Sequence, residues 1–159
     1  MPAEHDFRRW RVNVRTRTVT REPVPANWER LGGRGLIARI LLDEVDPTCE
    51  PLGPKNKLVF APGLLVGHML SASDRLSAGA KSPLTGGFRE SNCGGSTGMH
   101  MTNMGIRALI IEDMPSEPGW WVLYLGLEDA RWEKADDLVG RGVHEVAPSL
   151  LARYGNKVA

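Results

Sequence analysis

Residues 75–98 have the sequence Arg75-Leu-Ser-Ala-Gly-Ala-Lys-Ser-Pro-Leu-Thr-Gly-Gly-Phe-Arg-Glu-Ser-Asn-Cys-Gly-Gly-Ser-Thr-Gly98. Three cations alternate here with small hydroxyl residues and six glycines, and few of the side chains are suited to fill a core. Because glycine has no Cβ, its backbone can approach a ligand closely, and successive N–H groups can form an anion-binding hollow. We therefore expect this stretch to bring backbone amides and positive charge against a ligand that is flat, anionic or both.

The size and composition are those of an ordinary globular protein. The chain has 159 residues, of which 42% are apolar and 25% charged, so we expect a single domain with a proper core. No apolar run approaches the roughly 20 residues of a membrane helix, and the N-terminus lacks the regions of a secretory signal. A cytoplasmic protein without membrane contact is therefore the expectation.

The charge distribution excludes one class of partner and suggests another. A net charge of +1 is too small for a general nucleic-acid-binding surface. The charges are nevertheless uneven, because residues 1–40 contain nine arginines and four acids, whereas residues 112–137 contain eight acids and two bases. This asymmetry predicts either a basic face that meets an anionic ligand or a basic face that is simply solvated.

The cysteines and histidines of the sequence do not predict a metal site. Cys49 and Cys93 are the only cysteines, too few for a disulfide framework or a four-thiolate iron–sulfur site. His68 and His100 have no second ligand at metal-binding spacing, so surface or otherwise satisfied histidines are expected.

Hydrophobic periodicity predicts an α+β fold dominated by its sheet. In residues 8–15, Trp10, Val12 and Val14 alternate with polar residues, which is typical of a half-buried strand. Residues 33–45 carry an apolar stripe at helical spacing, and no internal repeat is apparent. The further expected elements are strands at 19–22, 57–61, 75–80, 108–112 and 121–125, a short helix at 99–104 and a third helix within 135–153.

Gly33-Arg-Gly-Leu-Ile-Ala38 formally fits the dinucleotide-binding pattern G-x-G-x-x-A. Its context does not fit, because no buried strand precedes it and no acid follows at the required distance in a βαβ unit. A glycine-rich helix start packed closely on the sheet is the better interpretation. The helix N-terminus beside Arg34 is still suited to hold a phosphate.

Taken with Leu31-Gly-Gly-Arg-Gly-Leu36 and Pro51-Leu-Gly-Pro54, residues 75–98 closely resemble the N-terminal domain of the aldehyde ferredoxin oxidoreductase family. Members of that family carry tungsten or molybdenum on paired pyranopterins. The resemblance runs from about Trp10 to Tyr154. It implies that residues 1–159 form a sheet-dominated, cofactor-cradling domain that stops before its last strands and a second glycine-rich segment.

The resemblance also assigns roles to individual residues. It implies that Arg75, Lys81, Asn92, Gly94 and Gly95 contact one pterin and its phosphates, with the Asn92 backbone carbonyl helping to bind a magnesium that bridges the phosphates. Arginine suits this role because its planar guanidinium forms paired hydrogen bonds with phosphate.

The residues themselves leave plainer alternatives open. Arg75 can form an ion pair with neighbouring Asp74, and residues 92–95 can form a simple turn capped by the asparagine. Cys93 lies within this segment, where a packing role is favoured over a metal-ligand role.

The implied function is that of the cofactor-binding N-terminal domain, or small subunit, of a tungsten or molybdenum oxidoreductase acting on aldehydes. No catalytic residue is assigned to this chain. The iron–sulfur cluster would belong to a partner chain, which would pass electrons to a ferredoxin-like carrier; self-association is the other option. The alternatives are a non-catalytic pterin-binding or structural subunit of a redox complex, or an inactive remnant.

Overall fold

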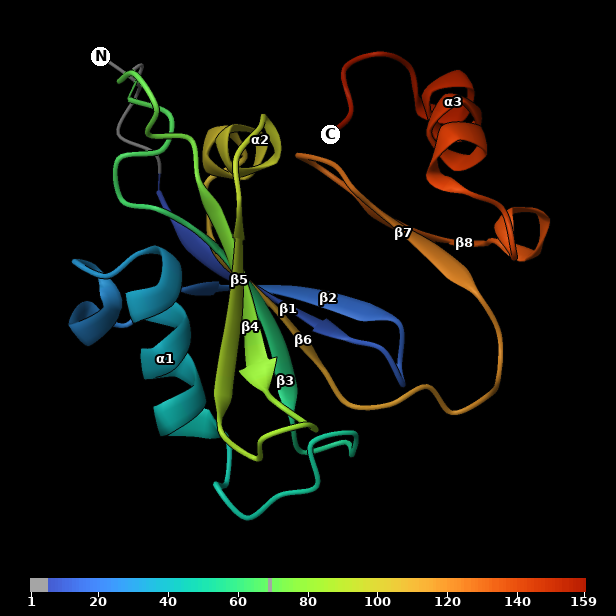
Figure 1. Cartoon of the computed structure of the whole chain (residues 1–159). Coiled ribbons are helices and arrows are strands. Elements are labelled where there is room, and N and C mark those ends of the chain that lie inside the picture. Colours follow the sequence, from blue (N-terminus) through green and yellow to red (C-terminus); the bar gives the residue numbers. More distant parts are fainter. Residues whose placement is uncertain (1–5, 69) are drawn as a thin grey trace. The chain divides into compact units, whose positions relative to one another are not determined.

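The computed structural model of the chain describes residues 6–68 and 70–159. Its contacts divide the chain into two compact units, one ending at Ser116 and the other spanning Glu117–Ala159. Figure 1 labels their helices and strands. We describe each unit by itself.

The first unit is built on a six-stranded sheet with the order β2-β1-β6-β3-β4-β5. Neighbouring strands are antiparallel except β1 and β6, which are parallel. The strands are β1 (Arg8–Asn13), β2 (Thr18–Pro23), β3 (Lys57–Pro62), β4 (Leu76–Lys81), β5 (Phe88–Cys93) and β6 (Ile106–Glu112).

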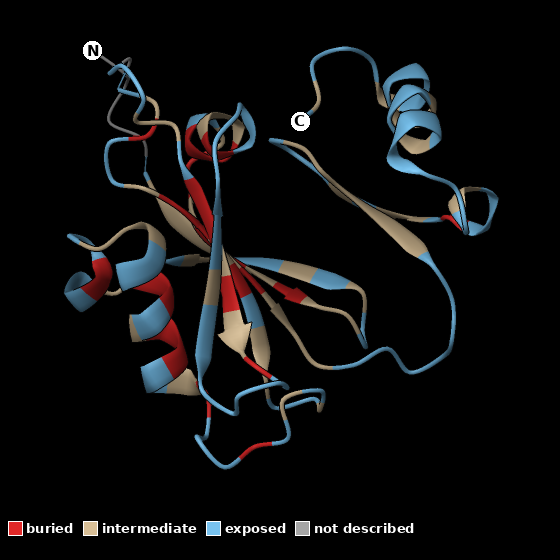
Figure 2. Cartoon of the chain, viewed as in Figure 1, coloured by how far each residue is buried: buried red, intermediate tan, exposed pale blue. Residues whose placement is uncertain are grey.

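Helix α1 (Gly33–Glu44) packs on β3 and β4 with the apolar stripe that the sequence predicts. Leu36, Ile37, Ile40 and Leu41 are buried in the core of this unit, and Figure 2 shows buried positions along one side of α1 and in the strands. Burying each such side chain contributes about 1.5–3 kcal/mol. Strand β1 confirms the predicted alternation at Trp10 and Val12, which are both buried, but it ends at Asn13 and so does not include Val14.

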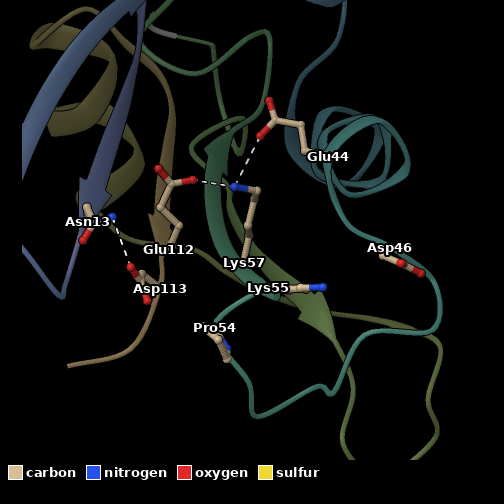
Figure 3. Close-up of a pocket in the computed structure, with 8 residues that line it drawn as sticks. All are labelled: Asn13, Glu44, Asp46, Pro54, Lys55, Lys57, Glu112 and Asp113. Atoms are coloured by element: carbon tan, nitrogen blue, oxygen red, sulfur yellow. Dashed lines mark hydrogen bonds and ion pairs between the residues drawn. The ribbon is translucent and has the colours of Figure 1, made fainter. Parts of the chain in front are cut away.

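A network of ion pairs lies at the C-terminal end of α1. Arg11 donates to Glu112 (3.0 Å), to Glu22 (3.1 Å) and to Glu44. Lys57 pairs with Glu44 (3.6 Å) and with Glu112, as the close-up in Figure 3 shows. Arg11, one of the nine arginines of residues 1–40, is therefore neutralised within the fold and does not face a ligand or solvent.

Helix α2 (Thr97–Asn103) completes the first unit near its predicted position. Leu76 and Ser77 in β4 are among the few residues of 75–98 that are buried, in keeping with the expectation that little of this stretch fills a core. The sequence reasoning missed β5, and it placed Asn92 and Cys93 in a loop, whereas both end that strand. This strand was missed because it is exposed along most of its length at the sheet edge and lacks alternating apolar residues.

The second unit contains a two-stranded hairpin and a helix. Strands β7 (Trp121–Leu125) and β8 (Ala130–Lys134) pair antiparallel, and β8 was not expected from the sequence. Tyr154 stacks on Tyr124 with ring centroids 5.2 Å apart, and its hydroxyl donates to Glu133 at 2.7 Å. These contacts join the helix to the hairpin.

The third helix begins later than predicted. A short 3₁₀ helix covers Asp136–Leu138, and α3 spans Val143–Tyr154. Gly140 between them has φ of 75°, a left-handed conformation that interrupts a right-handed helix.

The order hairpin, 3₁₀ helix, α-helix occurs in both units. The 3₁₀ helix begins seven residues before the α-helix each time, at Ala26 and Gly33 in the first unit and at Asp136 and Val143 in the second. This shared order of elements was not apparent from the sequence.

Candidate functional site

A cavity of about 260 Å³ lies where the first residues of α1 meet β4 and β5. It is lined by charged or polar side chains and by glycine backbone. The lining residues are Gly33, Arg34, Gly63, Arg75, Ser77, Glu90 and Asn92.

Strand register explains why residues distant in sequence line this cavity. In the antiparallel β4–β5 pair, Ser77 stands opposite Asn92 and Gly79 opposite Glu90. Directly opposed residues of an antiparallel pair project from the same face, and so do residues two apart on one strand. Ser77, Glu90 and Asn92 therefore share the face on which α1 packs.

Two of the predicted residues are in direct contact. An Arg75 guanidinium N–H donates to Asn92 Oδ1 at 3.3 Å, and Asn92 Nδ2 donates to Ser77 Oγ at 3.1 Å. Asp74 instead accepts the backbone N–H of Gly67 at 3.3 Å, and the ion pairs of the described residues do not include one between Asp74 and Arg75. The alternative role of Arg75 as the partner of Asp74 thus has no contact to support it.

The cavity also contains a buried carboxylate that the sequence analysis did not identify. Arg34 Nε donates to Glu90 Oε2 at 3.1 Å. The Glu90 side chain is only 7% exposed, while that of Arg34 is 71% exposed. Glu90 Oε1 is buried and has no hydrogen-bond partner.

Lys81 is not part of this group. It ends β4, five residues from Leu76, and this separation spans about 17 Å of extended chain. Its ammonium donates to the backbone carbonyls of Pro47 (2.6 Å) and Cys49. The structure gives Lys81 a local role, closing the loop after α1.

Gly94 and Gly95 are exposed and follow β5 directly. The backbone of Gly95 has φ of 104°, a conformation that residues other than glycine rarely adopt. A Cβ at Gly94 would meet nothing within 4 Å, so the fold itself has no steric need for glycine there. Cys93 is exposed at the end of β5, whereas Cys49 is buried.

The glycine-rich start of α1 packs closely at Gly32, but against the turn that follows β3 and not, as expected, against the sheet itself. A Cβ on Gly32 would lie 2.6 Å from the backbone nitrogen of Leu64, too close for any side chain. The preceding element is the 3₁₀ helix Ala26–Trp28, so the strand needed for a dinucleotide fold is not there.

A second cavity, of about 370 Å³, lies at the opposite end of α1 beside the ion-pair network (Figure 3). Its charges are largely committed to one another, because Lys57 pairs with Glu44 and Glu112, and Asn13 donates to Asp113 at 3.4 Å.

Neither cavity shows a metal centre built from protein side chains. Within residues 6–68 and 70–159, no group of three or more His, Cys, Asp and Glu side chains could hold a metal ion. Over the same residues, no helix is long and apolar enough to cross a membrane.

The fold is α+β, and its cavity lies where the start of α1 meets β4 and β5. Arginine, an asparagine amide and glycine backbone line this cavity. A family model described as "Aldehyde ferredoxin oxidoreductase, N-terminal domain" matches residues 9–159. The chain therefore belongs to the aldehyde ferredoxin oxidoreductase family, as the motifs predicted.

Curated relatives agree with this assignment. The chain is 32% identical over 151 residues to the tungsten-containing aldehyde ferredoxin oxidoreductase of Pyrococcus furiosus and 34% identical over 149 residues to that of Pyrococcus abyssi. Both alignments cover 92% of this chain and 24% of the relative, so the chain spans about a quarter of the length of these enzymes.

A solved structure shares the fold. The active site complex BamBC of benzoyl coenzyme A reductase, in complex with 1,5-dienoyl-CoA, matches with a TM-score of 0.86 and 27% identity. The match covers 94% of this chain and 23% of the other. It confirms the α+β fold predicted from the sequence.

Proposed function

We propose that this chain is the cofactor-binding N-terminal domain, or small subunit, of a tungsten or molybdenum pterin oxidoreductase that acts on aldehydes. The contact between Arg75 and Asn92 at the cavity carries the proposal. Two residues that the family resemblance assigns to the cofactor are in contact there, beside the N-terminus of α1.

The cavity fits part of such a cofactor. At about 260 Å³ it is smaller than the roughly 300–1,000 Å³ of pockets that enclose a drug-sized ligand, so it suits a phosphate-bearing end rather than a whole bis-pterin. Arg75 and the α1 N-terminus would bind the anionic end. The exposed backbone of Gly94 and Gly95 leaves space for a flat ring, and Asn92 would supply a carbonyl to magnesium.

In this division of labour, the bound metal–pterin group supplies two-electron redox chemistry, and the chain supplies binding, orientation and electrostatics. An iron–sulfur cluster and the electron carrier would belong to a partner chain, because Cys49 and Cys93 are too few to bind a cluster. A partner subunit is in keeping with the structural match, which is to a complex.

A second candidate function uses the same cofactor but acts on a different substrate. The matched structure comes from a reductase described with a coenzyme A thioester, not an aldehyde. This observation favours a cofactor-binding module that serves more than one reaction, or a non-catalytic subunit of a redox complex. In either case, residues outside this chain would determine the substrate.

Elemental and pterin analysis tests the proposal. The chain is expressed in cells supplied with tungstate and molybdate, and purified alone and with the gene product that carries the remaining family domains. We expect metal and pterin to accompany the assembled complex in a constant ratio. A correctly assembled complex without either one would contradict the proposed function.

A further inference from the structure

The ion pair between Arg34 and Glu90 differs from the network around Arg11 in how its partners are exposed. The Glu90 side chain is 7% exposed and belongs to β5, whereas the Arg34 side chain is 71% exposed and lies in the first turn of α1. In the other network, Arg11 is 15% exposed and its carboxylate partners are between 18% and 34% exposed. Glu90 is thus an anchored acceptor, and its partner faces the cavity instead of the core.

Stability alone does not account for this pair. Burying a carboxylate carries a large desolvation penalty, and an exposed cation offsets little of it, because solvent screens the attraction. Glu90 accepts a hydrogen bond from Arg34 Nε, while its second oxygen, Oε1, is buried without a partner and out of reach of a ligand. An apolar side chain at position 90 would avoid this penalty. The pair is therefore better explained by what its exposed end can bind.

The exposed end is a guanidinium with most of its donors free. Arginine has five N–H donors, and Glu90 accepts the one on Nε of Arg34. Within the part of the chain that the structure describes, no group accepts a hydrogen bond from its two terminal nitrogens. Their four N–H groups have the planar arrangement that suits paired hydrogen bonds with phosphate. Arg75, which lines the same cavity, is exposed as well. The cavity thus offers an anion two guanidinium groups from different elements of the fold.

We propose that Arg34 is a second anion-binding residue of the cavity, beside Arg75, and that Glu90 is its positioning residue. Glu90 holds Arg34 Nε from a buried place in the sheet, so that the terminal nitrogens are oriented before the anion binds. Ordering a long side chain in advance reduces the entropy that is lost on binding. The inference rests on the proposed function and adds to it two residues that the family resemblance did not assign.

Inorganic pyrophosphate is the probe, because it carries no ring and reports only on the anion-binding side of the cavity. The full chain is titrated with it at a fixed salt concentration, and NMR follows the backbone amides of the lining residues Gly33 and Ser77. We expect Arg34→Gln to lower the affinity about tenfold or more, because a charged hydrogen-bond donor is lost. Arg39→Gln is the matched control, at an arginine of the same helix that pairs with Asp43 outside the cavity, and it should change nothing.

Two neutral replacements of Glu90 separate its position from its charge. Both Glu90→Gln and Glu90→Met remove the carboxylate, whose charge by itself repels an anion. The amide carbonyl in Glu90→Gln can still accept the N–H of Arg34 Nε, whereas the thioether in Glu90→Met is a poor acceptor. We therefore expect Glu90→Gln to bind pyrophosphate about two- to tenfold more tightly than Glu90→Met, the effect of ordering one long side chain. The difference should disappear when each is combined with Arg34→Gln. Glu90→Leu provides the same comparison if Glu90→Met does not fold.

The outcomes separate this inference from the proposed function. If pyrophosphate does not shift the amides of Gly33 and Ser77 in the unaltered chain, the proposed function and the inference both lose their anion site. If it binds there and Arg34→Gln keeps the affinity of the control, the inference alone is overturned. Equal affinities of Glu90→Gln and Glu90→Met, with both variants folded by thermal unfolding, would overturn the positioning role of Glu90.

Discussion

Gly79 and Ile37 lie closer together than any side chain at position 79 would allow. A Cβ on Gly79 would be 2.8 Å from Ile37 Cγ2 and 3.0 Å from the backbone oxygen of Arg89. Helix α1 therefore sits directly on the backbone of β4, and this close packing holds the start of α1 over Ser77 and Glu90.

The substitution Gly79→Ala should destabilise the fold. Overpacking of a core contact costs about 1–3 kcal/mol, and the backbone atom on the other side cannot move away easily. Denaturant unfolding measures this loss. Gly87→Ala is the control, because its Cβ would approach nothing closer than 3.9 Å. Equal stability of the two variants would show that α1 adjusts to the added methyl group.

The network around Arg11 predicts a second stability effect. The side chain is 15% exposed and pairs with Glu22, Glu44 and Glu112. The substitution Arg11→Met leaves these partly buried carboxylates short of a partner, so we expect a loss of about 1–3 kcal/mol in the free energy of unfolding.

Arg39→Met is the matched control, because it removes an exposed i,i+4 pair with Asp43. Such pairs contribute about 0.3–0.5 kcal/mol. A loss for Arg11→Met no larger than that for Arg39→Met would show that the network adds little to stability.

Asp113 makes stability depend on pH in a defined direction. The side-chain hydrogen bond from Arg15, followed by the backbone N–H of Met114, holds the pKa of Asp113 below its ordinary value. A carboxyl group with a lowered folded-state pKa stabilises the fold above its unfolded-state pKa of about 3.9, and this contribution is lost as the pH falls through the folded-state pKa.

The substitution Asp113→Asn should therefore reduce the fall in melting temperature between about pH 5 and pH 2. Asparagine is the suitable replacement, because residue 113 has φ of 71°, which asparagine tolerates. Thermal scans across this range measure the difference. Parallel curves for the two proteins would mean that the bond from Arg15 is not maintained in solution.

Local patterns predicted the parts of this structure that depend on local chemistry. Two predictions of buried positions rested on a periodicity within a single element, and both are confirmed. They are the helical stripe from Leu36 to Leu41 and the strand alternation of Trp10 and Val12. Family resemblance placed Arg75 and Asn92 in one site, and strand pairing brings them into contact.

Features that depend on distant pairing were missed. Glu90 enters the cavity only because β5 pairs with β4, and an exposed edge strand carries no apolar period to reveal it. Family resemblance grouped Lys81 with Arg75, but the length of β4 separates the two residues. The late start of α3 follows from the left-handed conformation of Gly140, which periodicity does not report.

Arg75 should be needed for cofactor content rather than for folding. Its removal deletes a charged hydrogen-bond donor, worth about 1.5–3 kcal/mol, and so about tenfold or more in affinity for an anionic ligand. We expect Arg75→Ala to lower the pterin and tungsten content of the assembled enzyme while the melting temperature stays close to that of the unaltered protein. Arg30→Ala, at another exposed arginine outside the cavity, is the control. Equal metal content in both variants would remove Arg75 from the site.

The claim that this domain holds a pterin against bare glycine backbone is tested most directly at Gly94. The fold leaves room for a methyl group there, whereas Gly95→Ala should itself cost stability because φ is 104°. The measurement is pterin and tungsten per folded molecule in the assembled complex carrying Gly94→Ala, with the unfolding midpoint of the cofactor-free chain. The expected result is a strong loss of cofactor with an unchanged midpoint; normal loading with the same midpoint would contradict the claim.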